Sequence, residues 1–393
     1  MILLTTNQIH VLECDNHFYN ASDVIINYDY MSRYKRYCDQ VMVLVRSRST
    51  DQVDPSLARV DGDSVTVVPL PDPQIPIRAL MGLPGMILRV LATARQADCY
   101  YLKLPDATAT MVGLALWLTG RKFAVEVVAD CEQGILLAKQ GMPLLRFYAW
   151  LFEGLTRFLV KHAECATYIS RYLQERYPNR SPARQWLFCS VELTEEAIGQ
   201  PRQADQFATD PFRIIAAGRF SAEKGHIDLV RALKTVQQDA GRPVELCLLG
   251  DGPERGRLEN EARVLGLTDH VKFPGYVPHG SELYAHLDQA QLYCLPSLTE
   301  GMGRGLIEAM ARGLPCVGSA VGGVPEYLAE DCLFPSSNPG AMAQKILSAM
   351  NDPGRLAQMS HANIKAAQAF TPESLKAVKD DFWQAVHTHC GSS

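Results

Sequence analysis

The sequence predicts an α/β protein with two doubly wound domains, each built on a parallel sheet, and a final helix. Short apolar runs alternate with helical stretches in both halves of the chain, which is the pattern of a parallel sheet flanked by helices. The alternation weakens between about residues 179 and 210, where Pro182, Pro201 and the polar run QPRQADQFATD indicate a linker. We therefore expect domains over residues 1–195 and 205–370 and a terminal helix over residues 371–390.

The expected elements follow in order along the chain. In the first half we expect strands at residues 1–5, 40–45, 64–68, 99–102, 123–128 and 166–169, several of them followed by helical periodicity. In the second half we expect strands at residues 212–217, 244–249, 271–273 and 291–295, with helices at 227–239, 254–265 and 303–312. Thr371 as N-cap and Pro372 in the first turn begin the last helix. Because such sheets bind ligands beyond the carboxyl ends of their strands, the turns after the strands should carry the function.

Composition argues against two classes of protein. The formal net charge of the 393 residues is −5, whereas nucleic-acid-binding domains carry a basic excess, so we expect no nucleic-acid partner. The 11 cysteines are scattered without a CxxC pair, which favours reduced thiols in the cytoplasm and predicts no metal site. No run reaches the roughly 18 to 20 apolar residues of a membrane span, and the N-terminus lacks a signal-peptide pattern.

Residues 142–177 allow two interpretations. Apolar residues recur there with helical spacing, interrupted by Arg146, Arg157 and Lys161. The segment could be a helix packed on the first sheet with a solvated basic face, which we favour. It could instead rest on anionic lipid headgroups, which would make the protein peripheral on the inner face of the membrane.

The segment from Ser297 to Glu326 predicts a ligand site. An apolar run ends in a turn with glycines at 301, 303 and 305, and a helical segment follows. Glycines let a backbone approach a ligand closely, and the free N–H groups of a helix start suit anionic oxygens. Glu300 lies at the mouth of this turn, and Glu308 lies among apolar residues where a carboxylate needs hydroxyl or N–H partners. The alternative is a tight loop followed by a solvated glutamate.

Three earlier turns lie at equivalent places in the second half. Arg219 and Lys224 follow the strand at 212–217, and two cations there suit a diphosphate, although they could be incidental charges on a solvated loop. Gly250 begins a turn that fits a purely structural role at least as well. Tyr276 and Val277 follow the strand at 271–273, where the backbone could meet a planar base.

Taken in order, these segments resemble a known family. GRFSAEKG, LLGDGPER, VKFPGYVP, the Glu300 to Glu308 segment and Gly322 to Glu326 are similar to the retaining GT-B glycosyltransferases of family 4. The resemblance is specific from residue 212 to about residue 343 and weak before it. It implies two Rossmann-like domains that face each other across a cleft, with a C-terminal helix that crosses back to the first domain.

The resemblance implies a role for each matching residue. Arg219 and Lys224 match the pair that holds the donor diphosphate, and Glu300 matches the glutamate that faces the donor sugar; we group these three as catalytic. Arg304 stands where the family often has a small or apolar residue, so we expect it to influence the choice of donor sugar. The donor-binding residues implied are Gly218, Gly250, Tyr276, Val277, Met302, Gly303, Arg304, Gly305 and, for the ribose hydroxyls, Glu308.

The reaction implied is transfer of a sugar from a nucleotide diphosphate sugar to a hydroxyl, with retention at the anomeric carbon. We expect a UDP- or GDP-sugar rather than an ADP-sugar, no metal and no cofactor. The acceptor would be a glycan, a lipid-linked oligosaccharide or a glycolipid. Two alternatives remain: a GT-B sugar-nucleotide epimerase or phosphorylase, and a non-catalytic protein that binds nucleotide sugars.

Residues of the first domain are candidates for acceptor binding. Many members of the family have a glycine pair in the first loop, whereas this chain has Asp15, Asn16, His17 and Tyr19, which could bind a sugar or form an ordinary polar loop. Asp130 follows a predicted strand and is our candidate for a further catalytic carboxylate. Asp106 is a weaker candidate for the acceptor site, and the sequence also fits it as a helix N-cap.

Overall fold

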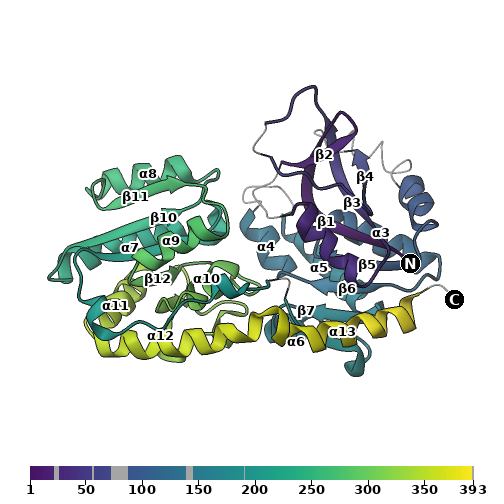
Figure 1. Ribbon diagram of the computed structural model, residues 1–393. Coiled ribbons are helices and arrows are strands. Elements are labelled where there is room, and N and C mark those ends of the chain that lie inside the picture. The colour runs from purple at the N-terminus through teal and green to yellow at the C-terminus, as the bar shows by residue number, and fades with distance from the viewer. Residues whose placement is uncertain (22–25, 55–56, 72–86, 139–144, 190, 392–393) are drawn as a thin grey trace.

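The structure, a computed structural model, describes residues 1–21, 26–54, 57–71, 87–138, 145–189 and 191–391. The chain forms two α/β domains that lie side by side, and two long helices run along the base of both (Figure 1). Each domain is built on its own sheet, as the alternation of strands and helices predicts.

The first sheet has the strand order β4-β3-β1-β5-β6-β7-β8, in which all neighbours are parallel. Its central strands are buried along their whole length, as expected where helices cover both faces, and the buried charges of Lys103 on β5 and Glu126 on β6 pair with each other at 3.4 Å. The strands are β1 Ile2–Cys14, β3 Gln40–Ser49, β4 Val65–Pro71, β5 Cys99–Leu104, β6 Ala124–Val127, β7 Cys165–Tyr168 and β8 Gln185–Leu187.

Helices cover both faces of this sheet. The described helices are α1 Tyr28–Ser32, the 3-10 helix η1 Arg33–Arg36, a helix over residues 87–94, α3 Ala107–Leu118, α4 Cys131–Ala138, α5 Leu145–His162 and α6 Arg171–Arg176. One core forms where α3 and α5 pack on the sheet, with Val112 and Leu159 fully buried. A second core lies on the other face, where α1 and η1 bring Met31 and Tyr34 to the sheet.

The first strand and the polar residues after it form a β-hairpin, where the sequence predicts a short strand and a loop. β1 extends to Cys14 and turns back at Asp15 and Asn16, whose φ angles are 50° and 62°, into the antiparallel strand β2 His17–Asn20. Asp and Asn tolerate such left-handed angles, which two-residue hairpin turns require. The polar run after the first strand is therefore a β-hairpin.

The second sheet has the order β11-β10-β9-β12-β13-β14, and all pairs are parallel. Its strands are β9 Phe212–Ala217, β10 Val244–Leu249, β11 Val271–Gly275, β12 Leu292–Leu295, β13 Cys316–Ser319 and β14 Leu333–Phe334. The helices are α7 His226–Asp239, α8 Arg255–Val264, α9 Ser281–Gln289, α10 Arg304–Ala311, α11 Pro339–Met350 and α12 Pro353–Ala367. These elements enclose a single apolar core.

The chain connects the two domains twice. It leaves the first core after Phe188, and Cys189 and Val191 already belong to the second core, so the change of core lies within the interval of about 179–210 where the sequence indicates a linker. It returns as α13 Pro372–Cys390, whose N-cap is Thr371, as the sequence predicts. Phe382 and Trp383 of this helix are buried in the first-domain core. The terminal helix therefore crosses back, and it closes the sheet face beside η1 (Figure 1).

The domains also meet directly beside the Ser297 to Glu326 segment. The two carboxylate oxygens of Glu326 accept hydrogen bonds from the backbone N–H groups of Arg171 and Tyr172, at 2.9 and 2.8 Å, and so cap the start of α6. A Cβ at Gly301 would lie 2.5 Å from the carbonyl oxygen of Val128 in the first domain. Glycine at position 301 therefore permits the close contact between the domains.

Candidate functional site

The predicted turns of the second domain surround one cavity of about 340 Å³. We call it the Glu300–Glu308 cavity. It lies where β9, β10 and β11 end and α10 begins, which is the edge expected for a ligand of a parallel sheet. The predicted residues that line it are Gly218, Arg219, Lys224, Gly250, Tyr276, Val277, Glu300, Gly303, Arg304, Gly305 and Glu308. Met302, also predicted, is 4% exposed and packs in the core beneath.

Glycines bring the turns around the cavity close together. A Cβ at Gly250 would lie 2.0 Å from the carbonyl oxygen of Gly218, so the turns after β9 and β10 could not approach this closely with another residue at position 250. Gly303, with φ of 87°, ends the turn before α10. The first N–H groups of a helix have no partner within the helix, and those of α10 start at this wall of the cavity.

Glu308 is a buried carboxylate with two basic neighbours. Its side chain is only 5% exposed. Oε1 accepts a hydrogen bond from Arg304 Nε at 3.1 Å, and Nδ1 of His279 lies 2.8 Å from the same oxygen. Burial by itself raises the pKa of Glu308, but the hydrogen bond with His279 and the charges of His279 and Arg304 outweigh it and leave the pKa below its usual value. Glu308 is therefore ionised at neutral pH.

Lys224 and Glu300 form the second charged pair of the cavity. Nζ of Lys224 donates to Glu300 Oε1 at 2.6 Å, and Oγ of Ser297 donates to the same oxygen at 2.8 Å. Burial disfavours the lysine charge, yet the charge and hydrogen bond of Glu300 raise the pKa of Lys224 above its usual value. The lysine thus stays cationic, and Arg219 from the same turn lines the cavity beside it.

Both glutamates present the same arrangement to the cavity. Among the contacts of the described residues, the side-chain partners of each carboxylate meet Oε1. Each Oε2 therefore remains available to accept a hydrogen bond from a ligand hydroxyl. Combined with two cations and a helix start, the cavity has the chemistry for a ligand that carries both anionic oxygens and hydroxyls.

Sequence reasoning missed His279. It lines the cavity and supports Glu308, yet it precedes α9 in the sequence and belongs to none of the predicted turns. The sequence gives only a weak signal for a role of His279 in the cavity, namely that His279 and Gly280 directly follow Val277 and Pro278 at the end of the third turn. Arg304 lines the cavity and its Nε donates to Glu308, while its influence on the choice of donor sugar stays a prediction.

The structure gives the two first-domain aspartates supporting roles. Asp130 is fully buried; its carboxylate pairs with Arg176 Nε at 2.9 Å and accepts from the Tyr172 hydroxyl at 2.5 Å and from the Gln133 N–H at 3.0 Å. It lies outside the Glu300–Glu308 cavity, so its catalytic role stays a prediction that this geometry does not favour. Asp106 is the N-cap of α3, with Oδ2 2.8 Å from the N–H of Ala109.

The four acceptor candidates near the start of the chain lie together on the β1–β2 hairpin. Asp15 and Asn16 form its turn, and His17 and Tyr19 lie on β2. Nδ1 of His17 is 3.1 Å from a carboxylate oxygen of Asp61. None of the four lines the Glu300–Glu308 cavity as described, and acceptor binding by them stays a prediction.

Residues 199–368 match the family model described as glycosyl transferases group 1. This part of the chain is therefore similar to group 1 glycosyltransferases, and the chain spans about half the length or less of the curated relatives named next. The chain is 31% identical over 167 residues to 2-deoxystreptamine glucosyltransferase of Streptomyces kanamyceticus, a match that covers 42% of this chain and 40% of that protein. It is 27% identical over 217 residues to a GDP-mannose-dependent phosphatidylinositol monomannoside mannosyltransferase of Mycolicibacterium smegmatis, covering 51% of this chain and 56% of that protein.

Solved structures show the fold of the whole chain. Sucrose-phosphate synthase from Thermosynechococcus elongatus superposes with a TM-score of 0.72, 19% identity and 99% coverage of both chains. HepE of Anabaena in complex with UDP-glucose gives a TM-score of 0.68 at 17% identity, again with 99% coverage of both chains. The protein therefore has the two-domain GT-B fold that the sequence predicts.

The described residues form neither a metal-binding cluster nor a membrane-spanning helix. Within the residues that the structure describes, no group of three or more His, Cys, Asp or Glu side chains could hold a metal ion. No described helix is both long and apolar enough to cross a membrane. On its inner side α5 packs in the first-domain core through Leu159 and Val160, which confirms the packed-helix interpretation for that face. Its outer side exposes Phe147, Trp150 and Leu151.

Proposed function

We propose that the protein is a retaining, metal-independent glycosyltransferase that uses a UDP- or GDP-sugar and needs no cofactor. The observation that carries this proposal is that Arg219 and Lys224, from the turn after β9, line one cavity with Glu300, from the turn before α10, and Glu308 of α10. The match of residues 199–368 to the group 1 family model and the similarity to a GDP-mannose-dependent mannosyltransferase support it. The sugar would be transferred to a hydroxyl of a glycan, a lipid-linked oligosaccharide or a glycolipid.

The cations would stabilise the leaving group. As the bond between the anomeric carbon and the diphosphate oxygen breaks, negative charge grows on the phosphate. Lys224 uses one N–H for Glu300 and keeps two for phosphate oxygens, while the planar fork of Arg219 can bridge two of them. The start of α10 adds N–H groups that are already in place. Because these donors are fixed before the reaction, they favour the transition state over the ground state.

The carboxylates would hold the sugar and the nucleoside. Oε2 of Glu300 can accept from a hydroxyl of the donor sugar, and Oε2 of Glu308 from a ribose hydroxyl. The exposed ring of Tyr276 at the cavity wall offers an apolar face to the base. As the new bond forms from the acceptor oxygen to the anomeric carbon, on the face that the diphosphate leaves, the acceptor proton passes to a phosphate oxygen. This route needs no protein nucleophile.

We further propose that the protein works in the cytoplasm and docks on anionic membrane through the outer side of α5. Phe147 and Trp150, which are 58% and 66% exposed, could enter the headgroup region, and the exposed Arg146, Arg157 and Lys161 of the same helix carry the complementary charge. The acceptor candidates Asp15, Asn16, His17, Tyr19, Asp106 and Asp130 are retained only as targets for mutation.

The test is nucleotide release from UDP-, GDP- and ADP-sugars, with and without a cell extract as acceptor. We expect release from a UDP- or GDP-sugar, stimulated by acceptor and unchanged by EDTA. Lys224→Ala and Glu308→Gln should each lower it about 100-fold. The matched controls Lys234→Ala on α7 and Glu282→Gln on α9, both at exposed positions, should retain wild-type activity.

Each alternative gives a different outcome in this experiment. Binding of a nucleotide sugar without release under any condition would favour the non-catalytic protein. Interconversion of sugars without an acceptor would favour an epimerase, and release driven by inorganic phosphate would favour a phosphorylase. A requirement for added metal would overturn the metal-independent mechanism.

A further inference from the structure

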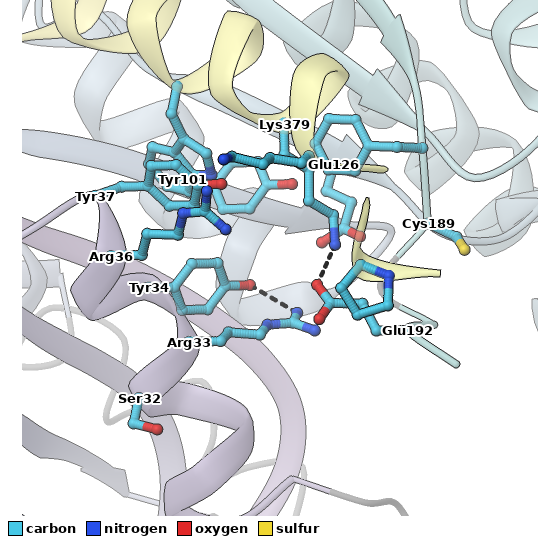
Figure 2. Close-up of a pocket in the computed structure, with 14 residues that line it drawn as sticks. Ser32, Arg33, Tyr34, Arg36, Tyr37, Tyr101, Glu126, Cys189, Glu192 and Lys379 are labelled. Carbon is cyan, nitrogen blue, oxygen red and sulfur yellow. Dashed lines mark hydrogen bonds and ion pairs between the residues drawn. The ribbon is translucent and has the colours of Figure 1, made fainter. Parts of the chain in front are cut away.

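A second cavity of about 310 Å³ lies between η1 and α13, beside the connection between the domains. We call it the η1–α13 cavity. Its walls come from three parts of the chain: η1 with the sheet of the first domain, the connection at Phe188, Cys189 and Glu192, and the first half of α13. Figure 2 shows side chains from η1 and α13 directed into the same space. It shares no lining residue with the Glu300–Glu308 cavity.

Aromatic rings form most of the apolar wall. Tyr37 and Trp383 stack with their ring centroids 5.2 Å apart and an interplanar angle of 13°. Tyr34 and Tyr101 meet the edge of the same Trp383 at 5.8 and 5.4 Å, so the rings hold one another in place. A rigid, mostly aromatic wall with a few polar groups is typical of a site for a small ligand. Hydroxylated rings pack their C–H faces on such surfaces.

The polar wall carries more cations than carboxylates, although Arg36 pairs with Asp380 at 3.5 Å and Lys379 pairs with Glu192. Four cations line the cavity against two carboxylates, Glu126 and Glu192. Glu126 is also neutralised from behind by Lys103, at 3.4 Å. The cations are Arg33, Arg36, Lys376 and Lys379.

Two of the cations have polar partners inside the cavity. Lys379 pairs with the carboxylate of Glu192, and Arg33 meets Tyr34 (Figure 2). Nη2 of Arg33 donates to the Tyr34 hydroxyl at 3.1 Å, and its guanidinium lies over the ring of Tyr30 at 3.7 Å. These contacts fix the planar fork in one orientation. Lys376 is exposed on α13 at the rim.

We propose that the η1–α13 cavity is a second ligand site, for a hydroxylated sugar ring that carries a carboxylate or a phosphate. The ring would pack against Tyr37, which Trp383 holds in place from behind, and the anionic group would meet the cations of η1 and α13. The site is separate from the donor site that we propose, and it does not depend on that function. Both chain connections between the domains line it, so its occupant touches the parts of the chain about which the domains would move.

The test uses glucose 6-phosphate, glucuronate and neutral glucose as probes, with binding followed by saturation-transfer NMR and titration calorimetry. We expect at least one anionic probe to bind with a dissociation constant of about 1 mM or lower, and glucose at least about tenfold more weakly. The anionic probe that binds better identifies the phosphate or the carboxylate as the preferred group. The proposal would be overturned if glucose bound as tightly as the anionic probes. It would also be overturned if neither anion bound at about 10 mM, tenfold above the expected dissociation constant.

Variants locate the probe. Lys376→Glu should weaken anion binding about tenfold, and Ser32→Trp, which fills the cavity without changing its charge, should abolish it. The matched control is Lys365→Glu, the same change at an exposed position of α12, which should have no effect. Lys224→Ala should also leave probe binding unchanged. Loss of binding in Lys224→Ala with normal binding in Lys376→Glu would place the probe in the Glu300–Glu308 cavity, which overturns this inference and leaves the proposed function standing.

Discussion

Gly322 offers a sharp test of how the Ser297 to Glu326 segment is held. Its φ is 52°, and a Cβ at this position would lie 1.7 Å from the carbonyl oxygen of Glu300. Gly322→Ala therefore forces the loop and the Glu300 backbone apart by more than an ångström. Such a shift would break the contacts of Oε1 with Lys224 at 2.6 Å and Ser297 at 2.8 Å. We expect activity to fall about 100-fold, the usual effect of moving a reacting group by ~1 Å.

Gly120→Ala is the matched control, because Gly120 also has positive φ, 70°, but nothing lies within 4 Å of its Cβ. Both variants carry the conformational strain of alanine in this region, about 1 kcal/mol. Overpacking adds about 1 to 3 kcal/mol for Gly322→Ala alone. Urea denaturation and nucleotide release measure the two effects. If Gly322→Ala matched Gly120→Ala in both stability and activity, the close contact that we describe would not exist in solution.

Three further predictions concern other parts of the molecule. Burial, aided by the charge of Lys224, lowers the pKa of His226 from 6.5 to about 3. Below pH 6.5 the unfolded chain therefore takes up a proton that the folded chain does not, and the free energy of unfolding decreases as the pH is lowered. His226→Phe should remove this loss, about 2 kcal/mol at pH 5, in urea denaturation; an unchanged pH slope would contradict the assignment. Trp150→Glu should reduce sedimentation with phosphatidylserine vesicles at low salt, whereas Val264→Glu, at an equally exposed position, should not, and equal sedimentation of both would refute docking through α5. Arg304→Ala should weaken binding of a nucleoside diphosphate about three- to tenfold in calorimetry, because it removes a hydrogen-bond partner of Glu308, the carboxylate proposed to bind the ribose. Unchanged nucleotide affinity would contradict this role of Arg304.

The sequence predicted best where one local pattern specifies one local geometry. A strand, a glycine-rich turn and a helix start follow one another at residues 292–311, and the parallel order of β9, β10 and β12 then brings the turns together. For that reason the four charged residues expected to act together do line one cavity. The terminal helix could also be predicted from the sequence, because Thr371 is its N-cap and Trp383 packs it into the first-domain core.

The remainder depends on contacts between distant segments. Asp130 follows a strand as a catalytic carboxylate would, but Arg176 and Tyr172, more than 40 positions later, both bind its Oδ2. His279 acquires its role only because α9 begins beside Glu308. The η1–α13 cavity is lined by residues that range from position 32 to position 383, so no local sequence pattern predicts it.

The most direct test of the central claim is a crystal structure of the protein with UDP or GDP bound. The account predicts the diphosphate between Arg219 and Lys224 at the start of α10, and the ribose hydroxyls at Glu308 Oε2. A nucleotide bound elsewhere, or bound in the Glu300–Glu308 cavity with its phosphates remote from both cations, would contradict it.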